Sequence, residues 1–310
     1  VIFIFASNIF GLFPPIYIGE VFNIVGDTIV ETPLDDNKEK LIKYQLSYYA
    51  LLVLAFAVAK GLFMFFMRQT IIVVSRRIEF DLKNEIYNQY QKLSISFYKK
   101  NKTGDLMNRI TEDVSRVRMY IGPAILYSLN LIISIALIIP KMTSISPKLT
   151  LYALSPLPLL VIAIYKVSSI MNKRSEVVQK QLSKLSSISQ ETFSGIRVIK
   201  SYIQEDFSQV KFMNAAEDYK EKSLNLVKVN ALFFPLMILL IGLSTLFTIY
   251  IGGLEAIAGN IQVGSIATFV IYVNMLTWPV ASLGWVTSIV QRAAASQKRI
   301  NEFLNEDPEI

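Results

Sequence analysis

The chain has 310 residues, of which 53% are hydrophobic and 18% are charged, and its net charge is +7. Soluble domains carry about 25% charged residues, so this composition excludes an ordinary soluble domain. The sequence has no Cys and no His, which excludes a disulfide framework and removes the commonest general base and metal ligand. We expect neither a catalytic site nor a metal site in this chain.

Six segments are apolar and long enough to cross roughly 30 Å of hydrocarbon, which takes about 20 residues of helix. They are residues 1–25, 45–67, 121–139, 149–171, 229–253 and 266–291. These segments predict an all-α membrane protein with six transmembrane helices. Pro140 and the short turn after it are expected to end the third. The chain opens on Val, in an apolar stretch without a secretory signal, so we expect the numbering to begin inside a longer protein.

Two long polar segments, residues 68–118 and 172–228, follow the second and the fourth span. Apolar side chains recur in them every three or four residues, which indicates hairpins of helices with one apolar face. In the first hairpin the stripes are Ile71, Val74, Ile78, Leu82, Ile86, Tyr90 and Leu93, then Leu106, Ile110, Val114, Val117 and Ile121. In the second the stripe is Val177, Leu182, Leu185, Ile188 and Phe193. Residues 101–104 and 201–211 are expected to form the two tips.

The placement of Lys and Arg predicts the orientation of the chain. The two hairpins hold 11 and 10 of its 31 basic residues, whereas segments 27–40, 141–148 and 259–264 hold two, two and none. The positive-inside rule therefore places both hairpins, and both chain ends, in the cytoplasm. Acids and bases interleave along the hairpins, which favours a projecting stalk of bundled helices. The alternative is a pair of amphipathic helices that lie on the membrane surface.

Several polar and aromatic side chains fall within the predicted spans, where such groups are functional candidates. Candidates for lining a cavity are Lys60, Asn130, Tyr272, Asn274 and Trp278, together with Lys166, Phe233, Phe234 and Trp285. The alternatives are that the lysines reach the membrane surface, that the asparagines bond between helices, and that the rings pack or face lipid. No Gly-x-x-x-x-Gly-Lys-(Ser/Thr) phosphate loop occurs, so we expect any ATPase to lie outside this chain.

Four motifs, in order along the chain, resemble those of one family. They are PPIYIGEVFNIV in the first span, FYKKNKTGDLMNRITEDV and ETFSGIRVIKSYIQED in the two hairpins, and VGSIATFVIYVNMLTWPV at the sixth span. The series resembles the transmembrane domain of an exporter-type (type 1) ABC transporter, in which AAASQKRINEFLNEDPEI would lead toward a nucleotide-binding domain. The resemblance covers nearly the whole chain.

The resemblance implies that two such domains, alike or different, pair around a central cavity as a domain-swapped dimer that exchanges the fourth and fifth spans. Each would be joined to a nucleotide-binding domain, absent from this chain, that binds ATP and Mg. Short coupling helices at the hairpin tips would dock on those domains, at about Tyr98–Leu106 and Tyr202–Val210. The coupling residues so implied are Tyr98, Lys99, Lys100, Asn101, Lys102, Thr103, Gly104, Asp105 and Leu106, and Tyr202, Ile203, Gln204, Glu205, Asp206 and Phe207.

The function that the resemblance implies is ATP-driven export of a lipidic or amphipathic, drug-like compound across the cell membrane by alternating access. The chain itself would bind no cofactor and no nucleic acid. Its partners would be the nucleotide-binding domain, a second transmembrane domain, the lipid bilayer and the hydrophobic substrate. The alternatives are a peptide exporter of the same fold and, outside the family, a channel or receptor scaffold with a helical stalk and no ATPase.

Overall fold

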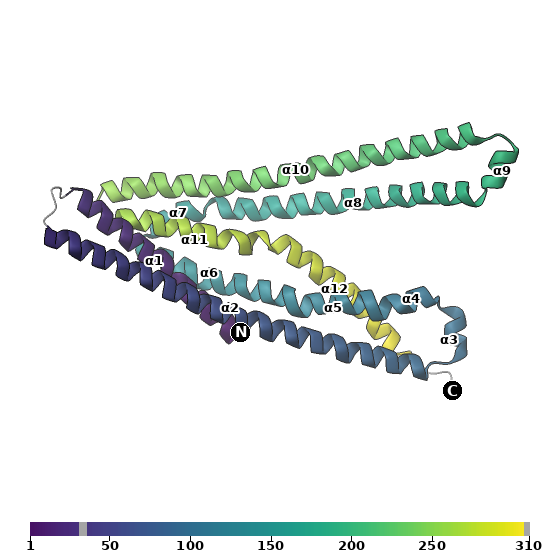
Figure 1. Cartoon of the computed structure of the whole chain (residues 1–310), viewed down its shortest axis with the longest axis horizontal. Helices are drawn as coiled ribbons and strands as arrows, with labels where there is room; N and C mark the ends of the chain where they lie inside the picture. The colour runs from purple at the N-terminus through teal and green to yellow at the C-terminus, as the bar shows by residue number, and fades with distance from the viewer. Residues whose placement is uncertain (31–35, 307–310) are drawn as a thin grey trace. The chain divides into compact units, whose positions relative to one another are not determined.

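The computed structural model describes residues 1–30 and 36–306, and among these it contains helices and no strand (Figure 1). The predicted all-α fold is confirmed. The elements are α1 (Ile2–Val30), α2 (Asp36–Lys92), α3 (Ile95–Lys100), α4 (Thr103–Asn108), η1 (Arg109–Asp113), α5 (Val114–Met119), η2 (Tyr120–Ala124), α6 (Ile125–Ile145), α7 (Pro147–Leu154), α8 (Pro156–Ser194), α9 (Ile196–Ser201), α10 (Glu205–Ile257), α11 (Val263–Ala281) and α12 (Leu283–Leu304). The elements η1 and η2 are single π-helical turns.

The chain folds as two compact units. Unit 1 contains Val1–Ser155 and the residues from Ser244 onward, and unit 2 is Pro156–Leu243. The helices α8 and α9 and the first part of α10 form unit 2, and the last residues of α10 belong to unit 1. The first hairpin and α12 therefore lie in one unit, and the second hairpin lies in the other.

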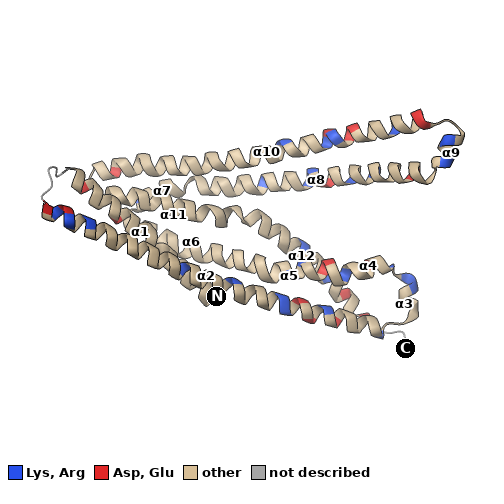
Figure 2. Ribbon diagram, in the orientation of Figure 1, with Lys and Arg blue, Asp and Glu red and all other residues tan. Residues whose placement is uncertain are grey.

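Six helical runs within the described residues are long and apolar enough to cross a membrane, which confirms the predicted number of spans. Two of the helices are far longer than the roughly 20 residues that a bilayer needs: α2 has 57 residues and α10 has 53. In unit 2, the charged residues gather on the part of α8 and α10 toward α9 (Figure 2). Apolar span and polar hairpin are thus parts of one continuous helix.

The third and fourth spans differ from the prediction. Helix α6 passes through Pro140 and ends at Ile145, so the expectation that Pro140 ends this span is wrong. Membrane helices tolerate proline within a span. One turn later, Thr143 donates to Ile139 O and Pro140 O at 3.1 and 2.9 Å. The fourth span is interrupted at Ser155, between α7 and α8. Ser155 keeps helical dihedral angles, but Pro156 has no backbone N–H to donate, so the hydrogen-bond series of the helix is broken there.

The core of unit 1 beyond the predicted spans joins both stripes of the first hairpin to the end of α12. Its buried side chains are Ile86, Leu93, Phe97, Leu106, Val114, Val117, Ile300 and Phe303. The two predicted stripes therefore pack together, and both also pack against α12, which the sequence did not indicate. Val74 is an exception at 47% exposed, because the neighbouring Ser75 instead faces Gly122 of η2.

Within the predicted membrane region, α1 packs closely against α11. A Cβ on Gly264 would lie 1.9 Å from the carbonyl oxygen of Gly19, so only glycine allows the two backbones to meet there. The Asn23 side chain accepts a hydrogen bond from Gly264 N at 2.6 Å, and Thr268 donates to Pro15 O at 2.9 Å. These contacts hold the first span against the last.

Unit 2 is an antiparallel hairpin of α8 and α10 that α9 closes (Figure 1). The buried side chains in the polar part of α8 are Val178, Gln181 and Ile188. Gln181 donates to Ala215 O of α10 at 3.1 Å, so α10 approaches along a face with a polar residue at its centre. The prediction is wrong for three members of the stripe, because Val177, Leu182 and Phe193 are 46%, 38% and 74% exposed.

Candidate coupling site

The tip of the first hairpin contains two short helices rather than one. Helix α3 covers Ile95–Lys100, and α4 covers Thr103–Asn108. The predicted coupling segment Tyr98–Leu106 therefore begins inside α3, crosses the link at residues 101–102 and ends in α4. Helix α3 ends because Asn101 adopts an extended conformation, and both its backbone N–H and its side chain donate to Phe97 O, at 3.1 and 3.0 Å.

The first tip presents a basic outer surface on an apolar base. Phe97 and Leu106 are buried, and the Tyr90 hydroxyl donates to Leu106 O at 2.5 Å. The exposed members of the predicted segment are Tyr98, Lys99, Lys100, Lys102, Thr103, Gly104 and Asp105, and Asn101 is half-buried. Three lysines against one aspartate give this surface a positive charge, which suits an acidic groove on a docking partner.

The tip of the second hairpin is a short helix followed by a strained turn. Helix α9 covers Ile196–Ser201, and α10 begins at Glu205. The predicted coupling residues Tyr202–Phe207 therefore form the turn and the start of α10, after α9 rather than within it. Ile203 has φ of +52°. This left-handed conformation costs an ordinary L-residue about 1–2 kcal/mol, and β-branched side chains adopt it rarely.

Exposed apolar side chains surround the strained turn. Tyr202, Ile203 and Phe207 are 73%, 82% and 68% exposed, and Lys200 pairs with Glu205 across the turn at 2.9 Å. Glycine or asparagine would form the same turn at lower cost. A strained, exposed apolar turn is typical of a binding surface, because strain persists where the side chain serves a purpose other than stability. Docking at this tip stays a prediction.

The C-terminal end of α12 is inserted into the first hairpin. Phe303 is 1% exposed, and its ring centroid lies 4.7 Å from that of Tyr90 and 6.0 Å from that of Phe97. The guanidinium of Arg109 stands over the same ring, 5.3 Å from its centroid. Tyr90 belongs to α2 and Phe97 to α3, so Phe303 ties the end of α12 to both helices beside the first tip.

A buried carboxylate adds a polar contact to this junction. The Asp113 side chain, at the end of η1, is 4% exposed and accepts hydrogen bonds from Ser296 at 2.8 Å and from Arg299 Nε at 3.0 Å. A second Arg299 nitrogen also donates to it, so the pair is bidentate. Burial raises the pKa of Asp113, but the hydrogen bonds from Arg299 and Ser296 and the charges of Arg299 and Arg116 outweigh burial, and this pKa lies below its usual value.

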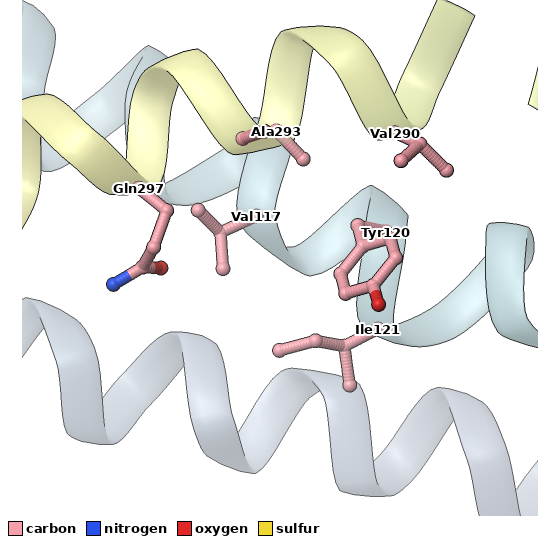
Figure 3. A pocket seen from close by; sticks show the side chains of 7 residues that line it. Val117, Tyr120, Ile121, Val290, Ala293 and Gln297 are labelled. Atoms are coloured by element: carbon pink, nitrogen blue, oxygen red, sulfur yellow. The ribbon is translucent and has the colours of Figure 1, made fainter. Parts of the chain in front are cut away.

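An apolar pocket of about 320 Å³ lies beside this junction, between α12 and the segment formed by α5 and η2 (Figure 3). Its lining residues are Val117, Tyr120, Ile121, Val290, Ala293, Ala294 and Gln297. Figure 3 shows the Gln297 amide at one end of the pocket and the Tyr120 hydroxyl toward the other. The pocket lies where the predicted third span begins, at Ile121, and near the end of the predicted sixth span, at Val290. The pocket therefore suits an apolar group with a polar end.

The family model that describes the ABC transporter transmembrane region matches residues 1–280. This chain belongs to that family. The Multidrug resistance-like ATP-binding protein MdlA of Escherichia coli (strain K12) is 31% identical over 266 residues, which are 86% of this chain and 45% of that protein. The ATP-dependent lipid A-core flippase of Syntrophus aciditrophicus (strain SB) is 28% identical over 282 residues, 91% of this chain and 47% of that protein. The chain spans about half the length of the curated relatives it matches.

In this ABC transporter domain, the predicted cavity residues on α11 have different surroundings. Tyr272 is fully buried and its hydroxyl donates to Leu12 O at 2.8 Å, so the ring packs between α11 and α1. A cavity role for Tyr272 stays a prediction. Asn274 is exposed and donates to a carbonyl of its own helix at 2.8 Å. Trp278 is 70% exposed. A cavity role for these two residues stays a prediction.

Lys60 and Asn130, the other predicted cavity residues, both lie against α1 of this domain. A Cβ on Gly11 would stand 3.2 Å from the Lys60 ammonium, so the missing side chain makes room for the lysine. Asn130 accepts a hydrogen bond from Asn8 at 2.9 Å, and Asn8 accepts one from Ser134 at 2.7 Å. Asn130 thus bonds between α6 and α1, one of the two alternatives considered for it. Asn8 and Ser134 were not predicted as partners, because residue type does not show which polar groups meet across helices.

Proposed function

We propose that this chain is the membrane part of an ATP-driven exporter that moves a lipidic or amphipathic compound by alternating access. The observation that carries the proposal is the junction at Phe303 and Asp113, which fixes the end of α12 beside the exposed tip of the first hairpin. A displacement applied at that tip would travel along α2, which continues from the hairpin into its span. Alternating access needs two states and an element that biases them.

ATP hydrolysis by a nucleotide-binding domain, which binds ATP and Mg, would drive transport. In support, several relatives carry "ATP-binding" in their names, and this chain covers only about half of their length. The basic first tip would dock in an acidic groove of that domain. The second tip would place the exposed side chain of Ile203 in an apolar one.

The exporter would contain two such domains in the cell membrane, with both hairpins in the cytoplasm. The Lys and Arg residues concentrated in the hairpins support this orientation. The outer face of α2 supports a lipid or subunit contact, because Leu51, Leu54, Val58 and Leu62 are each more than half exposed and line a groove of about 520 Å³. Exchange of the fourth and fifth spans between the two domains is part of this proposal.

The substrate class rests on the pocket beside α12. Its apolar wall and its two polar ends, Tyr120 and Gln297, match an amphipathic molecule that arrives at the membrane surface. The names of the relatives agree with this class, since they include multidrug resistance-like proteins and a lipid A-core flippase.

Inside-out vesicles that hold this chain with its nucleotide-binding domain test the function directly. We expect ATP to drive the accumulation of an amphipathic fluorescent dye, and a non-hydrolysable ATP analogue to drive none. Dye movement that is equal with and without ATP would contradict the exporter and favour the channel.

The variant Ile203→Gly separates docking from folding. Glycine adopts a positive φ without strain, so thermal stability should stay equal or rise by up to about 1 kcal/mol. Loss of a side chain that docking would bury should weaken the nucleotide-binding contact by about 1.5–3 kcal/mol, roughly tenfold or more in affinity. ATP-driven dye transport should fall accordingly. Ile203→Asn, which also tolerates this φ, serves as a second variant, and full transport in both would refute a docking role for Ile203.

A further inference from the structure

The part of the second hairpin nearest the predicted membrane carries only positive charge. Residues 163–175 and 222–254 contain basic residues and no acidic residue. The basic residues are Lys166, Lys173, Arg174, Lys222 and Lys228. Farther along the hairpin acids reappear and pair with bases, as Glu176 does with Lys180 at 2.8 Å. These two stretches therefore carry a net positive charge, and the first acidic residues beyond them toward the hairpin tip are Glu176 and Glu221.

Helix geometry places Arg174 and Asn225 at the level of the lipid headgroups. With the spans ending at residue 171 and beginning at residue 229, Arg174 lies about 4.5 Å and Asn225 about 6 Å outside the hydrocarbon. A headgroup layer is roughly 5–8 Å deep on each side of the bilayer. Lys222 lies about 10 Å out, where a long side chain still reaches that layer.

Arg174 and Lys222 line a pocket of about 320 Å³ between α8 and α10, together with Val177 and Asn225. A guanidinium nitrogen of Arg174 donates to the Asn225 carbonyl, which directs the side chain across the gap between the two helices. Lys222 donates to Asp218 at 2.6 Å, so part of its charge is balanced. In the described part of the chain Arg174 has no carboxylate partner, so its charge is left for an anion from outside.

We propose that this pocket binds the phosphate of an anionic phospholipid headgroup. The planar guanidinium of Arg174 presents paired N–H donors that match phosphate oxygens, and the Lys222 ammonium adds a second positive charge. Val177, which is 46% exposed, offers an apolar contact for the glycerol end of the lipid. Basic pockets between membrane helices on the cytoplasmic side suit such headgroups.

A membrane lipid is the favoured source of the phosphate because of the depth of the pocket. The bilayer holds headgroups at the level of Arg174, so their local concentration there is high. A soluble phosphate compound would bind from dilute solution, where salt screens its attraction to the basic side chains. The bound lipid would bridge α8 and α10 at the base of the second hairpin. This inference does not depend on the transported substrate or on docking at the tips.

Titration of the assembled transporter in detergent tests the site. The probes are phosphatidylglycerol, phosphatidylcholine and inorganic phosphate, and the readouts are the melting temperature and lipid retention in native mass spectrometry. We expect phosphatidylglycerol to raise the melting temperature and to be retained, and the other two to have little effect. The double variant Arg174→Gln with Lys222→Gln should bind phosphatidylglycerol about 25-fold more weakly.

A matched control removes two charges from the same helices farther from the membrane, by Lys184→Gln with Lys211→Gln, and should bind as the wild type does. Arg174→Lys keeps the charge but loses the fork of donors, so its affinity should lie between those of the wild type and the double variant. Equal stabilisation by phosphatidylglycerol and phosphatidylcholine would overturn the proposal. So would protection by millimolar inorganic phosphate without a preference for anionic lipid, or equal loss in the control.

Discussion

Phe303→Ala should destabilise this domain by about 3–5 kcal/mol, because it removes a fully buried ring from the junction between α12 and the first hairpin. The cavity would face Tyr90 and Phe97 and leave the Arg109 guanidinium without its ring. Thermal unfolding in detergent measures the loss. The chain has no Cys, so a cysteine introduced in place of Tyr87 on α2 and another in place of Glu302 on α12 can each carry a spin label. The distribution of distances between the two labels should be broader in the Phe303→Ala variant.

Two controls distinguish this contact from a general effect of losing a ring. Phe193→Ala removes the same atoms from a side chain that is 74% exposed, so it should change stability by less than about 0.5 kcal/mol. Phe303→Leu keeps most of the volume and should cost less than the alanine variant, since it loses chiefly the aromatic contacts. Equal stability of the Phe303→Ala and Phe193→Ala variants would show that the junction contributes nothing to the free energy of unfolding.

The first hairpin shows what periodicity predicts well. The two helices of this hairpin pack against each other, so both contacting faces belong to one segment of about fifty residues and both show the apolar spacing. Ile86, Val114 and Val117 are buried as expected. The second hairpin shows the limit. There α10 contacts α8 through Gln181, and a buried polar residue is invisible to a rule that looks for apolar spacing. The prediction therefore placed the buried face of α8 on the side of Val177 and Leu182, whereas the structure buries Val178, Gln181 and Ile188.

The candidate site was predicted as segments but not as contacts. The first tip was located within a few residues because Asn101 and Gly104 favour a turn. In both hairpins the short helices begin earlier than predicted, at Ile95–Lys100 and Ile196–Ser201, because their ends depend on local hydrogen bonds. The contact between Asp113 and Arg299 joins residues 186 positions apart, and nothing in either local sequence indicates the other. Pairings at that separation follow from the packing of α12 on the hairpin, which no single segment specifies.

Asp113→Asn should destabilise the junction by about 1–3 kcal/mol at neutral pH, because it weakens hydrogen bonds from a charged partner. Ser296 is fully buried and would keep an acceptor in the asparagine amide, whereas the bidentate pair with Arg299 would be lost. The side chain of Arg299 is 49% exposed, so water recovers part of its solvation and the effect stays below that of an enclosed ion pair. Lys298→Gln, which alters an exposed pair with Glu302 at 3.9 Å, is the matched control and should have little effect.

The pH dependence of this difference identifies the charge of Asp113 as its cause. The pKa of Asp113 is lowered in the folded chain, so its ionised form stabilises the fold fully above the unfolded pKa of about 3.9, and this contribution is lost as pH falls through the folded-state value. The gap in melting temperature between the wild type and Asp113→Asn should therefore be constant from about pH 6 to 8 and narrow below about pH 4. A gap that stays the same at acid pH would mean that the carboxylate contributes by shape and not by charge.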